Sequence, residues 1–482
     1  SVCRATSGPG ATNLVTGIAT AFMDSIPMVV ITGQVPQAVI GNDAFQEVDI
    51  TGITLPITKH NYLIQDVEEI QPVVKQAFYL ASSGRPGPVL IDIPKNILTA
   101  ECKQEHIIDL TLEGYNPTIT GHPGQIRRAV KLLEKASRPV IIAGGGARSC
   151  SSLLTISDRG DIPVVTTLMG KSAFPNSHPH YLGLYGYHGR VAANTAVSEA
   201  DVILSVGTRF GDRSTGPTDS FATDARIIHI DIDPAEISKN IPSFLPIVGN
   251  ADQVITEIAQ LLSCTPRKEW LARLETIQKS NPLPPAQQNF SIPNILNTVQ
   301  STAGEVTVVT DVGRHQIFAA HCITSSPQNP FITSGGMGTM GFGLPAAIGA
   351  SMGAPDKRMI LITGDGSFLM NCQEITTAVE QQAAVTVLVM NDMELGMIHQ
   401  LQDAFYDHRY ASCAFSQIVD FAALARSMGA ESCTASTLED VKTALKKASE
   451  VSGPYLIDCR ILKGENVLPM VTGSNLISFM AE

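Results

Sequence analysis

The sequence has no surplus of positive charge and no long hydrophobic run. Its 33 Lys and Arg residues are outnumbered by 45 Asp and Glu residues, and the net charge is −12. Nucleic-acid backbones are bound by clustered Lys and Arg, so this balance argues against a nucleic-acid-binding protein. No apolar stretch reaches the roughly 18–20 residues that a transmembrane helix needs. We therefore expect neither a nucleic-acid surface nor a membrane span.

Paired cysteines and a targeting segment are also missing. The nine cysteines are scattered, without a CxxC pair or the spacing of a disulfide framework, which is typical of thiols in a reducing compartment. The chain opens Ser-Val-Cys-Arg-Ala-Thr, with no signal or transit peptide. The predicted location is cytoplasmic, or a plastid or mitochondrion in a eukaryote. Residues 2–6 resemble the end of a buried strand, so we expect native sequence before Ser1.

Short apolar runs alternate with helical stretches along nearly the whole chain. The runs are continuous, which favours parallel strands covered on both faces. They span residues 28–32, 89–93, 139–143, 202–206, 227–232, 306–310, 359–363, 385–390 and 455–458. The predicted fold class is α/β, with doubly wound parallel sheets.

At 482 residues the chain is too long for one hydrophobic core, so about three domains are expected. Two stretches, about 104–124 and about 265–293, are rich in Pro and polar residues and are interpreted as linkers. The predicted domains are residues 1–104, 125–264 and 290–482.

A short pattern occurs twice. Residues 74–92 and 441–458 share a helical stretch, a Gly-Pro turn and a strand ending in Leu-Ile-Asp. The repetition is either chance between two ordinary αβ units or a sign that the first and third domains share a fold.

The clearest chemical signal follows the predicted strand 359–363. Gly364-Asp365-Gly366-Ser367 comes next, with a helix predicted from about Asn371. Glycine permits close backbone approach to an anion, and a helix N-terminus favours phosphate. The next strand leads to Asp392, 27 residues after Asp365. A lone Gly-Asp-Gly is often a plain turn, but two adjacent strand ends can place oxygen ligands on one Mg²⁺.

This unit resembles the thiamine-diphosphate motif, in which Gly-Asp-Gly is followed at about this spacing by Asn-Asn. The resemblance implies thiamine diphosphate and Mg²⁺ as cofactors. The contacts that it implies are Gly364, Gly366 and Ser367 for the cofactor, and Asp365, Asp392 and the backbone carbonyl of Glu394 for the metal. The second Asn of the motif is Asp392 here, which adds a negative charge beside the diphosphate. We expect an altered Mg²⁺ affinity.

Residues 334–345 contain five glycines and are too Gly-rich for a strand or a helix interior. They resemble the loop of the same enzymes in which a large apolar residue bends the cofactor. Met340 would be that residue, with Gly338 beside it. The alternatives are a flexible loop, or Met340 as part of the hydrophobic core.

Motifs along the whole chain resemble those of the acetolactate synthase (acetohydroxyacid synthase) large catalytic subunit. They lie at residues 7–13, 31–34, 43–47, 58–60, 84–88, 92–95, 166–170 and 467–470. The resemblance implies a pyrimidine-binding, a FAD-type middle and a diphosphate-binding domain. It also implies decarboxylation of pyruvate and condensation with a second 2-keto acid, pyruvate or 2-ketobutyrate, in branched-chain amino-acid biosynthesis. A homodimer or tetramer and a small regulatory subunit are the implied partners.

For the first domain, the resemblance implies catalytic roles for three residues. Gln46 would lie near the reacting carbon, with the cofactor-binding residues Pro9 and Asn13. Phe45 and Lys95 would line the substrate channel, where Lys95 could hold a 2-keto acid carboxylate or the diphosphate side of the site. The alternative is that Lys95 is a solvated residue after a strand.

For the third domain, the resemblance implies further cofactor contacts. His315 and Gln316 would approach the diphosphate, and Gly396 and Met397 would lie along the cofactor. Arg314 stands where the family usually has Gln.

The middle domain resembles the family's FAD domain, in which FAD is structural. The residues implied for FAD are Gly144, Gly145, Gly146, His188, Arg209, Arg213 and Asp231. An acid at a strand end is a usual ribose partner, and arginines suit the phosphates of a dinucleotide. The three glycines alone fit a phosphate loop or a structural turn equally. Gly211 and Asn250 depart from the Asp that is common at both positions.

Leu401 is a further departure, because the family has Trp there and the only Trp of this chain is Trp270. The family's Trp packs against the longer alkyl group of 2-ketobutyrate. Leu401 is therefore expected to lower the preference for 2-ketobutyrate and to weaken herbicide-type inhibitors that stack there.

The family activates thiamine with a Glu that lies before the segment where this chain begins, and Glu47 is no substitute because it belongs to a motif of its own. We expect low activity from these 482 residues alone. The alternatives are a related thiamine-diphosphate enzyme, of the pyruvate oxidase or glyoxylate carboligase type, or a catalytically dead chain.

Overall fold

The computed structural model describes residues 1–102, 112–417, 419–473 and 475–479. The chain forms two compact units: unit 1 contains residues 1–119 and 335–339, and unit 2 contains residues 120–334 and 340–482. Three sheets are present in this part of the chain, and every strand pair in them is parallel. The predicted α/β class is confirmed, and the residue boundaries of the three domains stay a prediction.

Unit 1 is built on a sheet with strand order β1-β2-β4-β3. Its elements are β1 (Val2–Ala5), α1 (Pro9–Thr12), α2 (Val15–Met23), β2 (Met28–Gln34), α3 (Ile50–Thr54), β3 (His60–Leu63), α4 (Ile70–Ser82), β4 (Pro88–Pro94) and α5 (Lys95–Leu98). Val89 and Ile91 of β4 belong to one core cluster and Leu90 to another, so both faces of the sheet are covered. The expectation of a buried strand at residues 2–6 is wrong in one respect: β1 is an edge strand, and Val2 is exposed.

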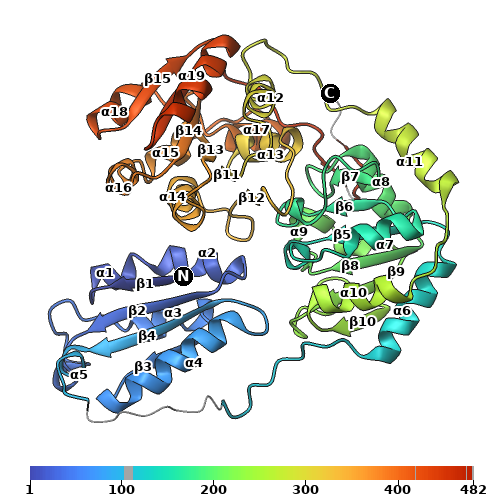
Figure 1. Ribbon diagram of the computed structural model, residues 1–482. Helices are drawn as coiled ribbons and strands as arrows, with labels where there is room; N and C mark the ends of the chain where they lie inside the picture. The colour runs from blue at the N-terminus through green and yellow to red at the C-terminus, as the bar shows by residue number, and fades with distance from the viewer. Residues whose placement is uncertain (103–111, 418, 474, 480–482) are drawn as a thin grey trace. The chain divides into compact units, whose positions relative to one another are not determined.

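The middle sheet, in unit 2, has strand order β10-β9-β8-β5-β6-β7 (Figure 1). Its elements are α6 (Pro123–Lys135), β5 (Pro139–Ala143), α7 (Leu153–Gly160), β6 (Val164–Thr166), β7 (Tyr181–Leu184), α8 (Val191–Glu199), β8 (Val202–Val206), α9 (Asp212–Thr215), β9 (Arg226–Asp231), β10 (Leu245–Val248), α10 (Ala251–Leu261) and α11 (Lys268–Ser280). Helices α6, α7 and α10 cover one face of this sheet, and α8 and α11 cover the other.

The third sheet, also in unit 2, has strand order β12-β11-β13-β14-β16-β15. Its elements are α12 (Ile292–Ala303), β11 (Val308–Thr310), α13 (Arg314–Cys322), β12 (Phe331–Ile332), α14 (Gly343–Gly353), β13 (Met359–Gly364), α15 (Asp365–Leu369), α16 (Glu374–Glu380), β14 (Val385–Asn391), α17 (Gly396–Phe405), α18 (Phe421–Ser427), β15 (Glu431–Ala435), α19 (Leu438–Glu450) and β16 (Tyr455–Arg460). Helices α12, α13 and α19 cover one face, and α14 and α18 cover the other.

The repeated pattern is supported by the topology of two sheets. Helix α4 leads into β4, and α19 leads into β16, as both copies predict. The strand order β1-β2-β4-β3 in unit 1 matches β13-β14-β16-β15 in the third sheet. A fold shared by the first and third domains therefore explains the repetition better than chance.

One predicted linker is wrong. Residues 265–293 contain the helix α11, in which Trp270 and Leu274 are buried in the core of the middle sheet. The indole nitrogen of Trp270 donates a hydrogen bond to the carbonyl oxygen of Pro139 (3.1 Å). Of the other predicted linker, residues 104–111 lie outside the described residues, and residues 112–122 form no helix or strand.

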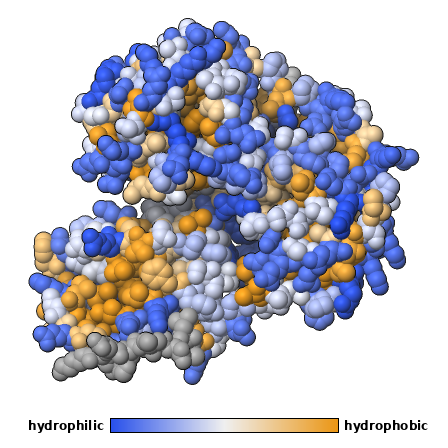
Figure 2. Space-filling model, viewed as in Figure 1, coloured by the Kyte–Doolittle hydropathy of each residue, from blue (hydrophilic) through white to orange (hydrophobic). Residues whose placement is uncertain are grey.

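The surface of unit 1 carries several large apolar side chains. Phe45, Leu55 and Leu98 are exposed, and the space-filling view shows a broad hydrophobic area on this unit (Figure 2). Among the described residues, no helix combines the length and the apolar character that crossing a membrane requires.

Candidate cofactor-binding site

Three neighbouring strands of the third sheet end at one edge. Strand β13 pairs with β11 on one side and with β14 on the other. The chain leaves β11 into α13, whose first residue is Arg314, and it leaves β13 directly into α15, whose first residue is Asp365. The sequence predicts a helix only from about Asn371, whereas α15 begins at Asp365, so the turn after β13 is tighter than predicted. Asp392 follows β14, so the topology brings all three side chains to the edge where α/β proteins bind ligands.

Asp365 is held by backbone amides. Its Oδ1 accepts a hydrogen bond from Gly366 N (2.6 Å), and its Oδ2 accepts one from Met393 N (2.6 Å). Burial, followed by the negative charge of Asp392, raises the Asp365 pKa from 3.8 to about 7. The carboxylate is thus fixed in place, and within the described part of the chain no positively charged side chain forms an ion pair with it.

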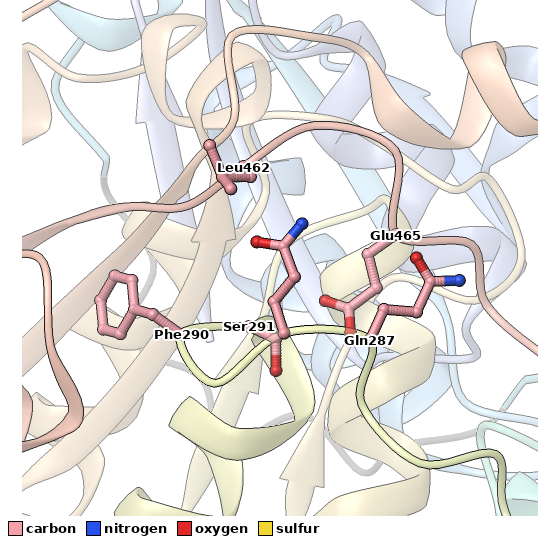
Figure 3. A pocket seen from close by; sticks show the side chains of 6 residues that line it. Gln287, Phe290, Ser291, Leu462 and Glu465 are labelled. Atoms are coloured by element: carbon pink, nitrogen blue, oxygen red, sulfur yellow. The ribbon is translucent and has the colours of Figure 1, made fainter.

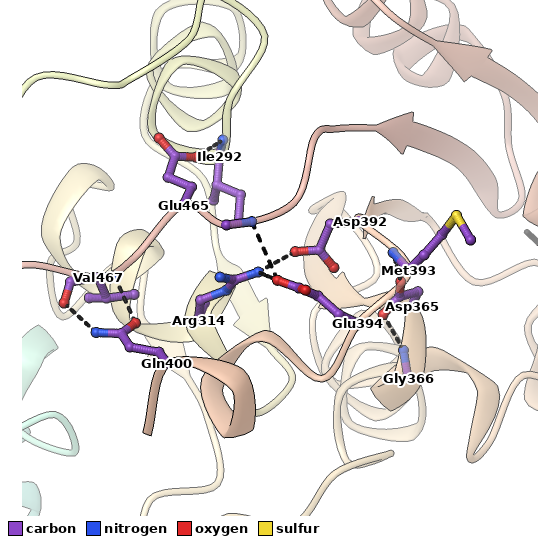
Figure 4. Close-up of polar contacts among 11 residues, drawn as sticks. Ile292, Arg314, Asp365, Gly366, Asp392, Met393, Glu394, Gln400, Glu465 and Val467 are labelled. Atoms are coloured by element: carbon purple, nitrogen blue, oxygen red, sulfur yellow. Dashed lines mark hydrogen bonds and ion pairs between the residues drawn. The ribbon is translucent and has the colours of Figure 1, made fainter. Parts of the chain in front are cut away.

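Asp392 lies in a buried ion pair (Figure 4). Arg314 Nη2 donates hydrogen bonds to Asp392 Oδ2 (2.5 Å) and to Glu394 Oε1 (2.6 Å). Burial raises the Asp392 pKa to about 6, although Arg314 acts in the opposite direction. The side chain of Glu394 is therefore engaged with Arg314, while its backbone carbonyl stays the predicted metal ligand.

Arg314 is a residue whose role sequence reasoning missed. In the sequence, Arg314 and Asp392 are two separate departures from the family pattern, and in the structure they form one ion pair. A Cβ atom at Gly396 would overlap the guanidinium group of Arg314. Gly396 therefore makes room for Arg314, and Met397 packs partly against the core of the third sheet.

The predicted diphosphate contacts lie in the first turn of α13 and near it. His315 lies against Gly364, and burial lowers its pKa to about 3, which keeps the imidazole neutral. Gln316 Nε2 instead donates to Thr333 Oγ1 (2.7 Å), and Ser367 Oγ donates to Val312 O (2.9 Å). Gln316 and Ser367 are thus already hydrogen-bonded within the protein.

The Gly-rich segment is divided between the two units. Within unit 2, Asp311 accepts hydrogen bonds from the amides of Gly341 and Gly343 (both 3.0 Å), which places the backbone after Met340. Gly338 belongs to unit 1, where Asp24 accepts a hydrogen bond from Gly336 N (2.7 Å). The expectation of no helix fails for the last residues of the segment, because α14 begins at Gly343.

The residues at the edge of the third sheet fit the implied cofactor. Asp365 and Asp392 are two buried carboxylates whose charges interact, which suits a hard divalent cation. Arg314 Nη1 and His315 Nε2 are buried and have no hydrogen-bond partner among the described residues. Polar atoms buried in this way suit an anionic group at the start of α13.

Only some of the site residues predicted for unit 1 lie close together. A Cβ atom at Gly8 would lie 2.8 Å from Cβ of Gln46, so the loop that carries Pro9 packs against Gln46. Gln46 has a left-handed backbone conformation with φ 59°. Phe45 is 89% exposed, which is unusual for so large an apolar side chain and points to a contact surface.

Two other predicted residues of unit 1 are placed by their elements. Asn13 caps the C-terminus of α1, and Lys95 is the exposed first residue of α5. Glu47 is committed to its own loop: its carboxylate accepts hydrogen bonds from Gly41 N and from Ala44 N, and these lower its pKa.

The middle sheet places the residues predicted for FAD at one edge. Gly144 follows β5, and Gly144 and Gly146 pack directly against Gly207, which follows β8. Asp231 ends β9, next to β8 in the sheet, as predicted for a ribose partner. Arg209 lies in the loop after β8, and Gly145 lies between the two packed glycines.

Two further residues predicted for FAD lie close to Tyr187. The Arg213 guanidinium lies 5.2 Å from the centroid of the Tyr187 ring, and the ring of His188 packs edge-on against the same tyrosine. Burial lowers the His188 pKa to about 4.

Two other groups of residues have features of a binding site. A small pocket is lined by Gln287, Gln288, Phe290, Ser291, Leu462 and Glu465 (Figure 3), but it contains none of the predicted site residues. Asp158, His178 and His180 have metal-ligand spacing. His178 Nδ1, however, accepts a hydrogen bond from His180 N (3.2 Å), so its proton lies on Nε2, which faces Asp158 Oδ1 at 3.1 Å. We interpret this group as a His–Asp hydrogen bond.

The sequence matches three domain families that belong to one kind of enzyme. "Thiamine pyrophosphate enzyme, N-terminal TPP binding domain" matches residues 1–53, the "central domain" matches residues 126–258, and the "C-terminal TPP binding domain" matches residues 311–459. The C-terminal match covers the edge that carries Arg314, Asp365 and Asp392.

Similar proteins span nearly all of the chain. The probable acetolactate synthase large subunit of Methanocaldococcus jannaschii is 44% identical, over 98% of this chain and 82% of its own length. The acetolactate synthase large subunit of Parasynechococcus marenigrum is 44% identical, over 98% of this chain and 78% of its own. That of Haemophilus influenzae is 41% identical, over 96% and 84%. The chain therefore belongs to the acetolactate synthase large-subunit family of thiamine pyrophosphate enzymes.

Proposed function

We propose that the protein makes acetolactate: it decarboxylates pyruvate with thiamine diphosphate and Mg²⁺, and it joins the two-carbon unit to a second 2-keto acid. The observation that carries the proposal is the convergence of Asp365, Asp392 and the start of α13 at one sheet edge. The names of the relatives support the reaction. Thiamine diphosphate supplies the carbanion-stabilising chemistry when it is bound.

The residues of the chain have distinct roles in this proposal. Asp365, Asp392 and the carbonyl of Glu394 would hold Mg²⁺, and the start of α13 would hold the diphosphate. Met340 would shape the cofactor, with its backbone fixed through Asp311. In unit 1, Gln46 would orient the substrate, and the exposed Phe45 and Lys95 would form part of the channel.

Product analysis tests the proposal. The full-length protein, with thiamine diphosphate, Mg²⁺ and FAD, is expected to convert pyruvate into acetolactate and CO₂ without consuming O₂. Acetyl phosphate formed with O₂ uptake would identify a pyruvate oxidase, and turnover of glyoxylate alone would identify a glyoxylate carboligase. Absence of any product, from a protein that still binds the cofactor, would identify a catalytically dead chain.

Acceptor choice gives a second prediction. Leu401 lies on α17 and is partly buried. Leu401→Trp is expected to raise the preference for 2-ketobutyrate over pyruvate about 10-fold, because an added apolar contact to one methylene contributes on the order of 1–3 kcal/mol. The measurement is the ratio of the two products when both acceptors compete. An unchanged ratio, or a strong 2-ketobutyrate preference in the unaltered protein, would contradict the role of Leu401.

FAD and the assembly complete the proposal. FAD would bind in a structural role at the carboxyl edge of the middle sheet, where Asp231 and Gly145 lie. The word "subunit" in the relatives' names supports an assembly of several chains, in which further copies and a small regulatory subunit are the proposed partners. Glu47 is bound to its own loop, so low activity of residues 1–482 alone stays a prediction.

A further inference from the structure

Arg314 occupies a position that an ordinary surface ion pair does not explain. Its side chain is 3% exposed, and the side chains of Asp392 and Glu394 are 8% and 3% exposed. Both acids are bonded to one nitrogen, Nη2. The other nitrogen, Nη1, is buried and has no hydrogen-bond partner within the part of the chain that the structure describes. Arg314 is therefore almost fully buried, while only one of its two terminal nitrogens is hydrogen-bonded among the described residues.

The surroundings are built to admit this side chain. Gly396 leaves the space that the guanidinium group fills, since any Cβ atom at this position would overlap it. Arg314 is also the first residue of α13, so its backbone is fixed at the same sheet edge as Asp365 and Asp392. A guanidinium group presents its N–H donors in a fixed planar geometry and can therefore hold a carboxylate in a fixed orientation.

We propose that Arg314 is a positioning residue of the Mg²⁺–diphosphate site, which neutralises Asp392 and orients its carboxylate so that an anionic diphosphate can bind beside it. The proposal rests on the proposed function. A bound diphosphate brings several negative charges to this edge. Asp392 without Arg314 would add another, in a buried place where like charges repel strongly. The free Nη1 leaves one buried donor available to the anion.

The test is a double-mutant cycle in the full-length protein that removes the two charges singly and together. The variants are Arg314→Gln, Asp392→Asn and the double variant. The measured quantity is the Kd of thiamine diphosphate at saturating Mg²⁺, determined by calorimetry. Arg314→Gln is expected to weaken binding about 10- to 100-fold, as the loss of a charge-assisted contact does. Asp392→Asn alone is expected to bind at least as tightly as the unaltered protein, and the double variant is expected to regain most of the lost affinity.

Two further variants keep the result interpretable. Arg314→Lys retains the positive charge and is expected to bind thiamine diphosphate more tightly than Arg314→Gln. This variant keeps the test valid even if Arg314→Gln is partly unfolded. Arg358→Gln is the matched control. Arg358 precedes the opposite end of β13 and donates to the carbonyl oxygen of Gly453 (3.2 Å), so its loss is expected to lower the unfolding temperature without changing the Kd.

The outcomes separate the two proposals. Failure of the unaltered protein to bind thiamine diphosphate would overturn the proposed function. Normal binding by the unaltered protein and equally tight binding by folded Arg314→Gln would overturn only the inference about Arg314. The same holds if the double variant stays as weak as Arg314→Gln, because Arg314 would then act independently of Asp392.

Discussion

Replacing Asp365 with Asn is expected to lower the rate of acetolactate formation by at least about 10³-fold, because a bound metal ion contributes several kcal/mol of charge stabilisation. Asn keeps one oxygen but loses the negative charge that balances a divalent cation. It also offers an N–H group where Met393 N and Gly366 N both donate to the carboxylate. The measurement is steady-state turnover, with the Mg²⁺ Kd determined separately.

The same substitution is expected to stabilise the protein when metal and cofactor are absent. The Asp365 pKa is raised from 3.8 to about 7, first by burial and then by the charge of Asp392. Between about pH 4 and about pH 7 the folded protein therefore binds a proton that the unfolded chain has lost, and the free energy of unfolding falls as pH rises through this window. Asp365→Asn has no carboxyl group at this position, so its free energy of unfolding does not fall in this way. At pH 8 its free energy of unfolding should exceed that of the unaltered protein, by on the order of 2–4 kcal/mol at most.

Opposite signs for activity and stability distinguish a functional acid from a structural one. Urea unfolding at pH 5 and pH 8, without Mg²⁺, measures the stability difference. Asp458→Asn is the control: Asp458 is a buried carboxylate on strand β16, which pairs with β14, and it accepts from Asn391 Nδ2 (2.9 Å), so its loss should leave the Mg²⁺ Kd unchanged. Normal Mg²⁺ binding by Asp365→Asn would show that Asp365 only caps the turn after β13.

Apart from the edge strand β1, the strands that the sequence predicts lie in the middle of a sheet, although the sequence does not predict the short interior strand β6. Strands β4, β5 and β14 are buried at every position because helices cover both faces, and this produces the continuous apolar runs. The edge strands β3 and β15 have partly exposed side chains that interrupt such a run, and they were not predicted. Helix α11 was missed because Pro and Gln on its C-terminal side resemble a linker, while its buried residues are only Trp270 and Leu274.

The candidate site was predictable to the extent that it follows from strand order. Asp365 and Asp392 meet because their strands are neighbours, a consequence of ordinary parallel topology. The link from Arg314 to Asp392 joins residues 78 positions apart and depends on the direction of one long side chain. No local pattern encodes that direction. The only signal was that two departures from the family pattern carry opposite charges.

The other large effect is expected at Gly144. Alanine at this position would place Cβ in overlap with the carbonyl oxygen of Gly207, and at 2.7 Å from the carbonyl carbon and 2.8 Å from Cα of Thr208. All these atoms belong to the backbone of the loop after β8, which cannot turn aside as a side chain can. Gly144→Ala is therefore expected to lower the free energy of unfolding by at least about 3 kcal/mol. Chemical denaturation, followed by circular dichroism, measures it.

Gly145 is the matched control, and it also tests FAD binding. A Cβ atom at Gly145 would meet only Met169, with its Cβ at 3.4 Å and its carbonyl oxygen at 3.9 Å, so Gly145→Ala is expected to fold with nearly unchanged stability. If the three glycines form a phosphate loop, the added methyl group lies where the backbone must approach the FAD phosphates. Gly145→Ala should then bind FAD at least about 10-fold more weakly, as measured by flavin fluorescence.

The two variants together decide between the two interpretations of this loop that the sequence leaves open, a structural turn and a phosphate loop. A structural turn needs glycine only at Gly144 and Gly146, where the backbone of Gly207 lies close. A phosphate loop needs glycine at Gly145 as well, because the backbone there must approach the phosphates and not because of packing within the protein. Loss of FAD from the stable Gly145→Ala protein would therefore identify the loop as a phosphate-binding element. Tight FAD binding by Gly145→Ala, together with an unstable Gly144→Ala, would leave only the packing role.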